Sequence, residues 1–253
     1  TNLVLGGIDF AILEDRKFKS GPEGKIPQQG PRPDHIRNPS YDPTTIDLPD
    51  LKLLGKRQLN FLKNWSDQNK NNLKVVLSQT GFCGGAHIHG SLDNRLHADL
   101  DSNGWPQTGR NKALTLLQKA KAVHIAGDQH LATVIKQGID EFGDGPWAFI
   151  VPAIVNDYYS RWWWPEDEKA GNNPNKNTSL PWTGEYLDGF DNKITMMAYV
   201  NPESDSKGGG YGLIHFDKKN RTTTFECWPR YVDVTKEGAA QFEGWPITIS
   251  MQP

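Results

Sequence analysis

The sequence has little cysteine and no long apolar run, and these absences exclude several classes of protein. Only Cys83 and Cys227 occur among the 253 residues, without a Cys-x-x-Cys pair of the kind that holds zinc or performs redox chemistry. They could form one disulfide or remain buried thiols. No apolar stretch approaches the roughly 20 residues that a membrane helix requires, and no charged-then-apolar signal peptide opens the chain. The absence of an initiator Met indicates processing, or a chain cut from a longer one.

An excess of charge of one sign is also missing. With 28 basic and 30 acidic residues the net charge is -2, so composition gives no reason to expect binding to nucleic acid or acidic membranes. The hydrophobic fraction of 36% is low, but nine Trp, ten Phe and seven Tyr argue against disorder. The 25 Gly and 17 Pro gather in clusters that mark long connections. We therefore expect one folded domain with many loops.

Several catalytic signatures are absent as well. The sequence has no Gly-x-Ser-x-Gly elbow, no His-Glu-x-x-His and no P-loop. The glycine-rich run from Gly208 to Gly212 precedes a strand without a following helix, which argues against dinucleotide binding. Ser78 and His130 could act as nucleophile and base, but no orienting partner is evident. Of the kinds of catalysis considered, metal-assisted hydrolysis remains.

The stretch Gly127-Asp128-Gln129-His130 is the most informative part of the chain. It follows a helix-like segment, Asn111 to Lys121, and a short apolar run, Ala122 to Ala126. That order predicts a helix, a buried strand and a glycine turn that presents a carboxylate and an imidazole. Two such groups can face one hard or borderline metal ion. The alternative is a turn aspartate beside a surface histidine.

Two earlier strands are expected to end in the same way. Ile8 to Leu13 runs into Glu14, Asp15 and Arg16, and Leu73 to Leu77 runs into Ser78, Gln79 and Thr80, with an amphipathic helix predicted over Leu51 to Trp65. In open α/β sheets, ligands gather outside the carboxyl ends of the strands. We therefore expect these polar residues to converge with Asp128 and His130.

The second half of the chain has a different character. Trp162, Trp163 and Trp164 could form a carbohydrate-stacking wall or belong to a flap packed on the core. The tail predicts strands over 194–200, 211–216 and 221–228, with a hairpin turn between the last two. We expect an α/β part (1–137), an aromatic-rich loop or flap (138–193) and a β-rich part (194–253).

Five motifs in order resemble the alkaline phosphatase D-like (PhoD-like) metallophosphatases, over the region from about Ile8 to His130. They are Ile12 to Lys19, Leu54 to Leu62, Lys74 to Gln79, Asp101 to Pro106 with Arg110, and Gly127 to His130. The resemblance implies a four-layer α/β/β/α sandwich that hydrolyses phosphate esters at a site of two or three metal ions, often iron with calcium. It also implies an extracytoplasmic location, periplasmic or secreted.

The resemblance also assigns site residues by position. Asp128 and His130 match the late Gly-Asp-x-His metal motif, and Arg16 matches the arginine of an Asp-x-Arg element that supports the site or the phosphate. The resulting metal ligands are Asp128, His130, Asp205 and Gln79, the catalytic residues are Asp15, Arg16 and Asn103, and the substrate-binding residues are Arg16, Trp105 and Arg110.

The family's early motifs, a Gly-Asp-x-x-Tyr and an Asp-Asp-His-Glu-like sequence, have no counterpart here. Asp128 and His130 alone would hold a metal cluster poorly, because such sites need three or more protein ligands per ion or shared bridging groups. We therefore expect this chain to be the C-terminal portion of a longer phosphatase, which could be completed by an N-terminal fragment. The alternative function is a non-catalytic binding module that uses its aromatic surface on a glycan or partner.

Overall fold

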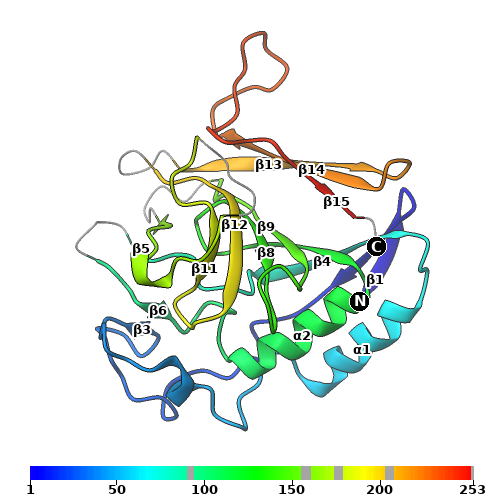
Figure 1. Ribbon diagram of the computed structural model, residues 1–253. Coiled ribbons are helices and arrows are strands. Elements are labelled where there is room, and N and C mark those ends of the chain that lie inside the picture. Colours follow the sequence, from blue (N-terminus) through cyan, green and yellow to red (C-terminus); the bar gives the residue numbers. More distant parts are fainter. Residues whose placement is uncertain (90–93, 155–160, 174–178, 203–207, 252–253) are drawn as a thin grey trace.

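A computed structural model describes residues 1–89, 94–154, 161–173, 179–202 and 208–251. Within these residues, eight strands form one large sheet, the main sheet, in the order β1-β2-β4-β7-β9-β8-β12-β11 (Figure 1). Their bounds are β1 (Asn2–Leu5), β2 (Ile8–Ile12), β4 (Leu73–Thr80), β7 (Ala122–Gly127), β9 (Trp147–Ile150), β8 (Thr133–Gln137), β12 (Lys193–Tyr199) and β11 (Gly184–Leu187). The sheet is mixed, because β2, β4, β7 and β9 run parallel whereas the outer pairs are antiparallel.

Two α-helices, α1 (Lys56–Asp67) and α2 (Gln107–Lys119), cover one face of the main sheet (Figure 1). Their apolar positions recur at helical spacing and bury Leu62 and Trp65 on α1, and Leu114 and Leu117 on α2, in one core cluster with strand residues such as Val76. Both predicted helices are confirmed. The first begins later than expected, because Gly55 occupies its N-cap position with an extended backbone.

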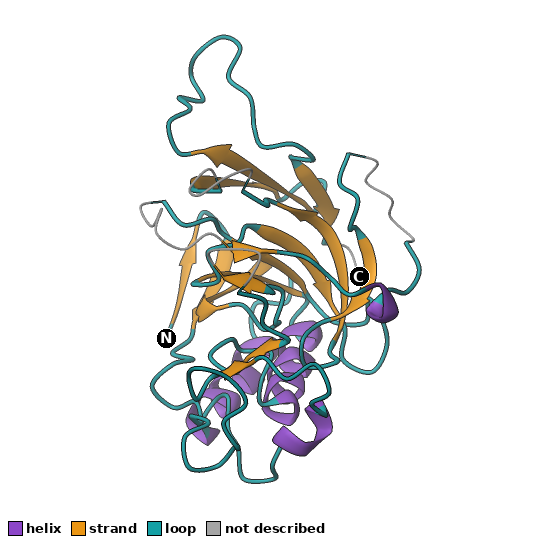
Figure 2. Ribbon diagram, turned by 90° about the vertical axis from the view of Figure 1, so that its left-hand side faces the viewer, coloured by secondary structure: helices purple, strands orange, loops and turns teal. Residues whose placement is uncertain are grey.

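A second sheet, β13 (Gly210–Asp217), β14 (Thr222–Pro229) and β15 (Ile247–Ser250), packs on the opposite face of the main sheet (Figures 1 and 2). The contact is aromatic: the ring of Phe149 in β9 lies 5.1 Å from that of Phe225 and 5.5 Å from that of Trp245. The α/β class and the β-rich C-terminal part are thus confirmed. The described residues supply three layers, helices, main sheet and second sheet.

The three segments expected from the sequence all contribute to the main sheet. β9 and β11 come from the segment expected as an aromatic-rich loop, and β12 follows in the C-terminal part. The remaining short elements are β3 (His35–Ile36) paired with β6 (Ala98–Asp99), β5 (Ile88–His89) paired with β10 (Arg161–Trp162), and the 3-10 helices η1 (Pro43–Ile46) and η2 (Asp167–Lys169). These pairs tie the long loops after β2 and β4 to each other and to the segment around Arg161.

The described residues bear on two further points raised by the sequence. Cys83 and Cys227 are both free and buried, so the thiol alternative holds. Burial raises the pKa of the Cys83 thiol to about 12, which makes it unreactive near neutral pH. In the part of the chain that the structure describes, no helix has the length and apolar character needed to cross a bilayer.

Candidate functional site

The carboxyl ends of the parallel strands β2 and β4 are joined through Asp15, which is fully buried. Its carboxylate accepts hydrogen bonds from the backbone N–H of Gln79 (3.0 Å) and of Thr80 (3.1 Å), while its own N–H donates to the side-chain oxygen of Gln79 (3.0 Å). Burial raises the pKa of Asp15, and the N–H groups of Thr80 and Gln79 act in the opposite sense. The two strand ends therefore form one rigid platform.

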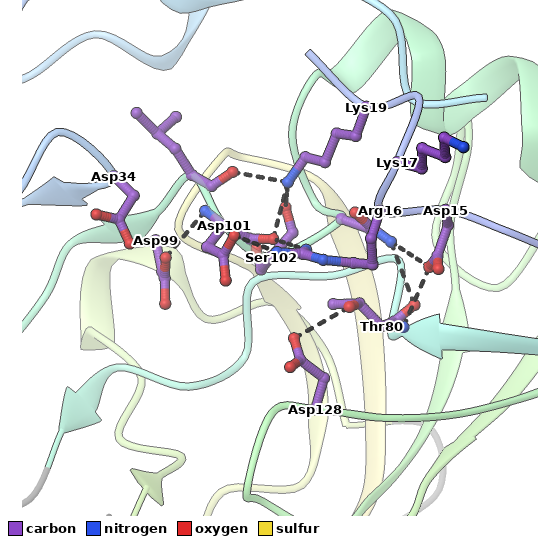
Figure 3. A network of polar contacts seen from close by, with 12 residues as sticks. Asp15, Arg16, Lys17, Lys19, Asp34, Thr80, Asp99, Asp101, Ser102 and Asp128 are labelled. Atoms are coloured by element: carbon purple, nitrogen blue, oxygen red, sulfur yellow. Dashed lines mark hydrogen bonds and ion pairs between the residues drawn. The ribbon is translucent and has the colours of Figure 1, made fainter. Parts of the chain in front are cut away.

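Thr80 extends this platform to β7. Its hydroxyl donates to the carboxylate of Asp128 at 3.0 Å (Figure 3), and Thr80 has no exposed surface. Asp128 is exposed on the turn after β7 and has a φ of 70°, and His130 has a φ of 51°. Two non-glycine residues in the left-handed region are costly, and such backbones persist where the surroundings fix them, frequently at functional sites.

Arg16 follows the same platform and lies among carboxylates. Its guanidinium forms an ion pair with the Asp101 side chain and donates to the Asp101 carbonyl at 2.7 Å (Figure 3). Burial lowers the pKa of Arg16, but the hydrogen bond and charge of Asp101, with the charges of Asp128 and Asp15, outweigh it, so the pKa is raised. The ion pair joins the loop of Asp101 to the platform. We define the strand-end site as Asp15, Arg16, Thr80, Asp101, Asp128 and His130.

The loop that carries Asp101 and Asn103 is held by Lys19. The Lys19 ammonium donates to three backbone carbonyls, those of Leu100 (2.7 Å), Asp101 (2.8 Å) and Ser102 (2.7 Å), and burial lowers the pKa of Lys19 to about 7. The buried Asn103 amide donates to the Asp15 carboxylate and, at 3.4 Å, to the Thr80 carbonyl. Asn103 therefore joins the loop to the platform.

Beside this site, the pairing of β3 with β6 assembles a second group of metal-type donors. Asp34, His35 and Asp99 offer ligand atoms within 4.8 Å of one another, and His35 stands opposite Asp99 in the register. Burial raises the pKa of Asp99 to about 6. Sequence reasoning missed this group because it lies partly in the proline-rich segment 21–49; the adjacent Asp34-His35 pair was the available signal, and nothing linked it to Asp99.

Arg161 connects the two groups electrostatically. Its guanidinium nitrogen lies 3.6 Å from an Asp99 carboxylate oxygen. Burial lowers the pKa of Arg161, whereas the charges of Asp99 and Asp128 both raise it. The strand-end site and the Asp34 group thus share one positively charged neighbour.

The donor sets fit a metal ion to different degrees. Asp128 and His130 supply two donors, one fewer than the three that a catalytic metal commonly takes from protein. Asp34, His35 and Asp99 supply two carboxylates and an imidazole, a set suited to a hard or borderline cation. Asp34 is held in a bidentate pair by Arg32 (3.1 and 2.9 Å), so a cation at that group competes with a guanidinium.

Of the other residues assigned from the sequence, two are buried and one lies outside the described residues. Trp105 is fully buried and donates to the Ile46 carbonyl (2.8 Å), and Arg110 is 1% exposed and donates to the carbonyls of Phe82 (2.7 Å) and Gly138 (2.9 Å). Both therefore support the fold around the loop of Asn103. Asp205 lies outside the described residues.

Two alternatives from the sequence are corrected by the structure. The Ser78 hydroxyl lies 2.7 Å from Nε2 of His124, a residue of β7, and donates a hydrogen bond to the Thr80 carbonyl at 3.0 Å. Ser78 is therefore bonded within the platform and does not form a pair with His130. Trp163 is fully buried and its ring N–H donates to the Trp182 carbonyl, so Trp163 is not part of an exposed stacking wall, whereas Trp164 is exposed. The packed flap is the correct reading for Trp163.

Comparison with known proteins supports the architecture. Neither the protein families nor the curated proteins contain a match. Among solved structures, the structure of PhoD matches with a TM-score of 0.57 and 15% identity, over 99% of this chain and 42% of that one. The fold is PhoD-like. At this identity the likeness shows the fold alone, and this chain spans less than half the length of the PhoD chain.

Proposed function

We propose that this chain carries the site of a metal-dependent hydrolase of phosphate esters, of the alkaline phosphatase or phosphodiesterase type. The observation that carries the proposal is the ion pair of Arg16 with Asp101 beside the hydrogen bonds that join Thr80 to Asp15 and Asp128, at adjacent parallel strand ends of a PhoD-like fold. Carboxylates gather cations, and a guanidinium binds phosphate oxygens through two parallel donors. In this proposal the carboxylates bind the metal ion and the neighbouring guanidinium binds the phosphate.

The roles follow from the contacts. Asp128 and His130 would hold a metal ion, iron with calcium by resemblance, and Asp205 and Gln79 are further candidates. When bound, such ions supply a water with its pKa lowered toward ~7 and neutralise phosphate charge. Thr80 fixes the Asp128 carboxylate, and Arg16, whose side chain is 34% exposed, can turn from Asp101 to phosphate oxygens. An extracytoplasmic location is part of the same proposal.

Hydrolysis of p-nitrophenyl phosphate and bis(p-nitrophenyl) phosphate by the full chain tests the proposal, with and without added iron and calcium. We expect turnover that requires metal and is lost in Asp128→Asn. The matched control is Asp233→Asn, because the exposed Asp233 also accepts from a threonine hydroxyl, that of Thr235 (2.7 Å). Absence of metal-dependent turnover in the unmodified chain, or full activity in Asp128→Asn, would refute it.

A further inference from the structure

A cavity of about 620 Å³ lies away from the strand-end residues, between the end of β12 and the second sheet. Its walls are the segment 179–182, the residues at the end of β12, the start of β13, the end of β14, and Phe242 with Glu243. This volume falls in the range of about 300–1,000 Å³ that small-molecule sites occupy. We refer to it as the aromatic cavity, because Trp182, Tyr199, Tyr231 and Phe242 line it.

Two of the aromatic side chains that line the cavity pack on each other, and a third is exposed. Trp182 and Tyr199 are stacked, with ring centroids 6.3 Å apart and planes at 29°, and Trp164 supports Trp182 from 5.1 Å. Tyr231 is 88% exposed, and the Arg230 guanidinium lies 4.6 Å from its ring centroid. A tyrosine so exposed at the mouth of a cavity offers a large contact area to a ligand.

The charged groups of the cavity can serve hydroxyl groups. Arg230, which donates to the Ile154 carbonyl at 3.4 Å, carries five guanidinium N–H groups, and Glu243 carries two acceptor oxygens. The charge on Glu243 adds to the rise that burial produces in the pKa of Tyr199. The amide of Asn201 is already used: its oxygen accepts from the N–H of Trp163 and its nitrogen donates to the carbonyl of Trp163, both at 2.8 Å. Asn201 therefore fixes the backbone of Trp163 beside the cavity.

The wall of the aromatic cavity is physically joined to the proposed metal site. The N–H of Val200 donates to the carbonyl of Ala132 at 3.0 Å, and Ala132 is two residues beyond His130, a span of at most about 7 Å. Asn201 holds the backbone of Trp163, two residues beyond Arg161. The backbone after β12 that lines the cavity is therefore hydrogen-bonded to the chain that follows His130.

We propose that the aromatic cavity binds a sugar ring, as the organic group of a glycosyl phosphoester; this substrate class rests on the proposed function. The C–H groups of a sugar ring are attracted to the negative faces of aromatic rings, and its hydroxyls match a carboxylate and a guanidinium. An acyl chain would need aliphatic walls, whereas the lining residues include only Leu180 and Val200 of that kind.

Binding is tested first without catalysis. Methyl glycosides of glucose, galactose and N-acetylglucosamine are titrated into the full chain and followed by tryptophan fluorescence and NMR. We expect saturation with at least one of them, affinity reduced about tenfold in Tyr231→Ala and reduced in Glu243→Gln, and no change in Asp128→Asn. Leu5→Ala is the control, because it removes an exposed apolar side chain (68%) from the edge strand β1. No saturation with any of the three glycosides overturns the cavity proposal, whatever the hydrolytic activity.

Kinetics then test the link to the strand-end site. For glucose 1-phosphate we expect Tyr231→Ala to raise KM about tenfold, with no change for ethyl phosphate, which carries the same phosphoryl group without a ring. Equal effects on both substrates contradict a ring-binding role. If the unmodified chain hydrolyses neither ester although a glycoside binds, the proposed function fails and the sugar site stands.

Discussion

The hydroxyl of Thr80 donates a 3.0 Å hydrogen bond to the carboxylate of Asp128, and in doing so joins the end of β4 to the turn after β7. The backbone of Thr80 is itself held by hydrogen bonds, since its N–H donates to Asp15 and its carbonyl accepts from Ser78 and Asn103. The orientation of the proposed metal ligand is thus set by a buried threonine.

Thr80→Val should weaken metal binding more than it weakens the fold. Valine keeps the shape of threonine and removes the donor that holds Asp128, and loss of an outer-shell partner commonly lowers metal affinity about 10–100-fold. The unfolding free energy should fall by only about 1 kcal/mol. Isothermal titration with iron and calcium measures the affinity, and urea unfolding measures the stability.

Two further variants separate orientation from general damage. Thr80→Ser should restore most of the affinity, and Thr235→Val, which breaks the same kind of bond to the exposed Asp233, should leave metal binding unchanged. If Thr80→Val binds metal as tightly as the unmodified chain, Asp128 does not depend on Thr80 for its orientation.

Lys19→Met should loosen the loop over residues 100–102. The ammonium satisfies three carbonyls, and a buried acceptor left without a partner costs about 1–3 kcal/mol. We expect faster amide hydrogen exchange at residues 99–103 and a lower urea midpoint. Lys17→Met is the control, because Lys17 is exposed two residues away; a similar loss in both variants would show that the three carbonyls do not matter.

His124 should make the protein sensitive to mild acid. Burial lowers its pKa to about 3, so between about pH 6.5 and 3 the unfolded chain binds a proton that the folded chain does not. The contribution of His124 to the free energy of unfolding is fully present above pH 6.5 and is lost as the pH falls. The free energy of unfolding then decreases by at most about 1.4 kcal/mol per pH unit. His87, whose pKa burial lowers to about 4, adds to the same trend.

Urea unfolding from pH 7 to 4.5 measures this slope. In His124→Gln the slope should decrease by the contribution of about one bound proton. In Ser78→Ala, which removes the hydroxyl bonded to His124 but leaves the imidazole buried, the slope should persist. An unchanged slope in His124→Gln would mean that other groups account for the acid sensitivity.

Asp9→Asn should be strongly destabilising. The Lys74 ammonium, 2% exposed, lies 3.7 Å from the Asp9 carboxylate, which also accepts from the Trp65 ring N–H at 2.9 Å. Removing one partner of a buried pair costs about 3–5 kcal/mol, because the other charge stays buried. Breaking the exposed pair with Asp67→Asn, beside Lys119, should cost less than about 1 kcal/mol. Equal urea midpoints for the two variants would contradict this difference.

Local signals in the sequence predicted the platform and its helices. The apolar runs before Glu14, Ser78 and Asp128 became β2, β4 and β7, and their polar ends meet as expected for parallel strands. The hairpin turn predicted at Asp217 to Asn220 is also confirmed, with the Asn220 amide bonded to the Asp217 carboxylate at 2.6 Å. In each case the local sequence pattern and the packing of distant segments favour the same secondary structure.

The parts that could not be predicted depend on contacts between distant segments. His35 pairs with Asp99 across 64 positions, and neither β3 nor β6 is long enough to show a periodicity. β1 was also missed, although Gly6 and Gly7, with φ of 60° and 78°, form the kind of two-residue turn that identifies a hairpin. The aromatic cavity arises only when β12 and the second sheet are packed together.

The central claim is that the turn of Asp128 and His130 holds a metal ion for phosphoester chemistry. Crystals of the full chain grown with iron and calcium, measured by anomalous diffraction, test it most directly. We predict an anomalous peak bonded to the Asp128 carboxylate and the His130 imidazole, and its loss in crystals of Asp128→Asn. A structure at saturating metal in which no peak lies at this turn would contradict the account.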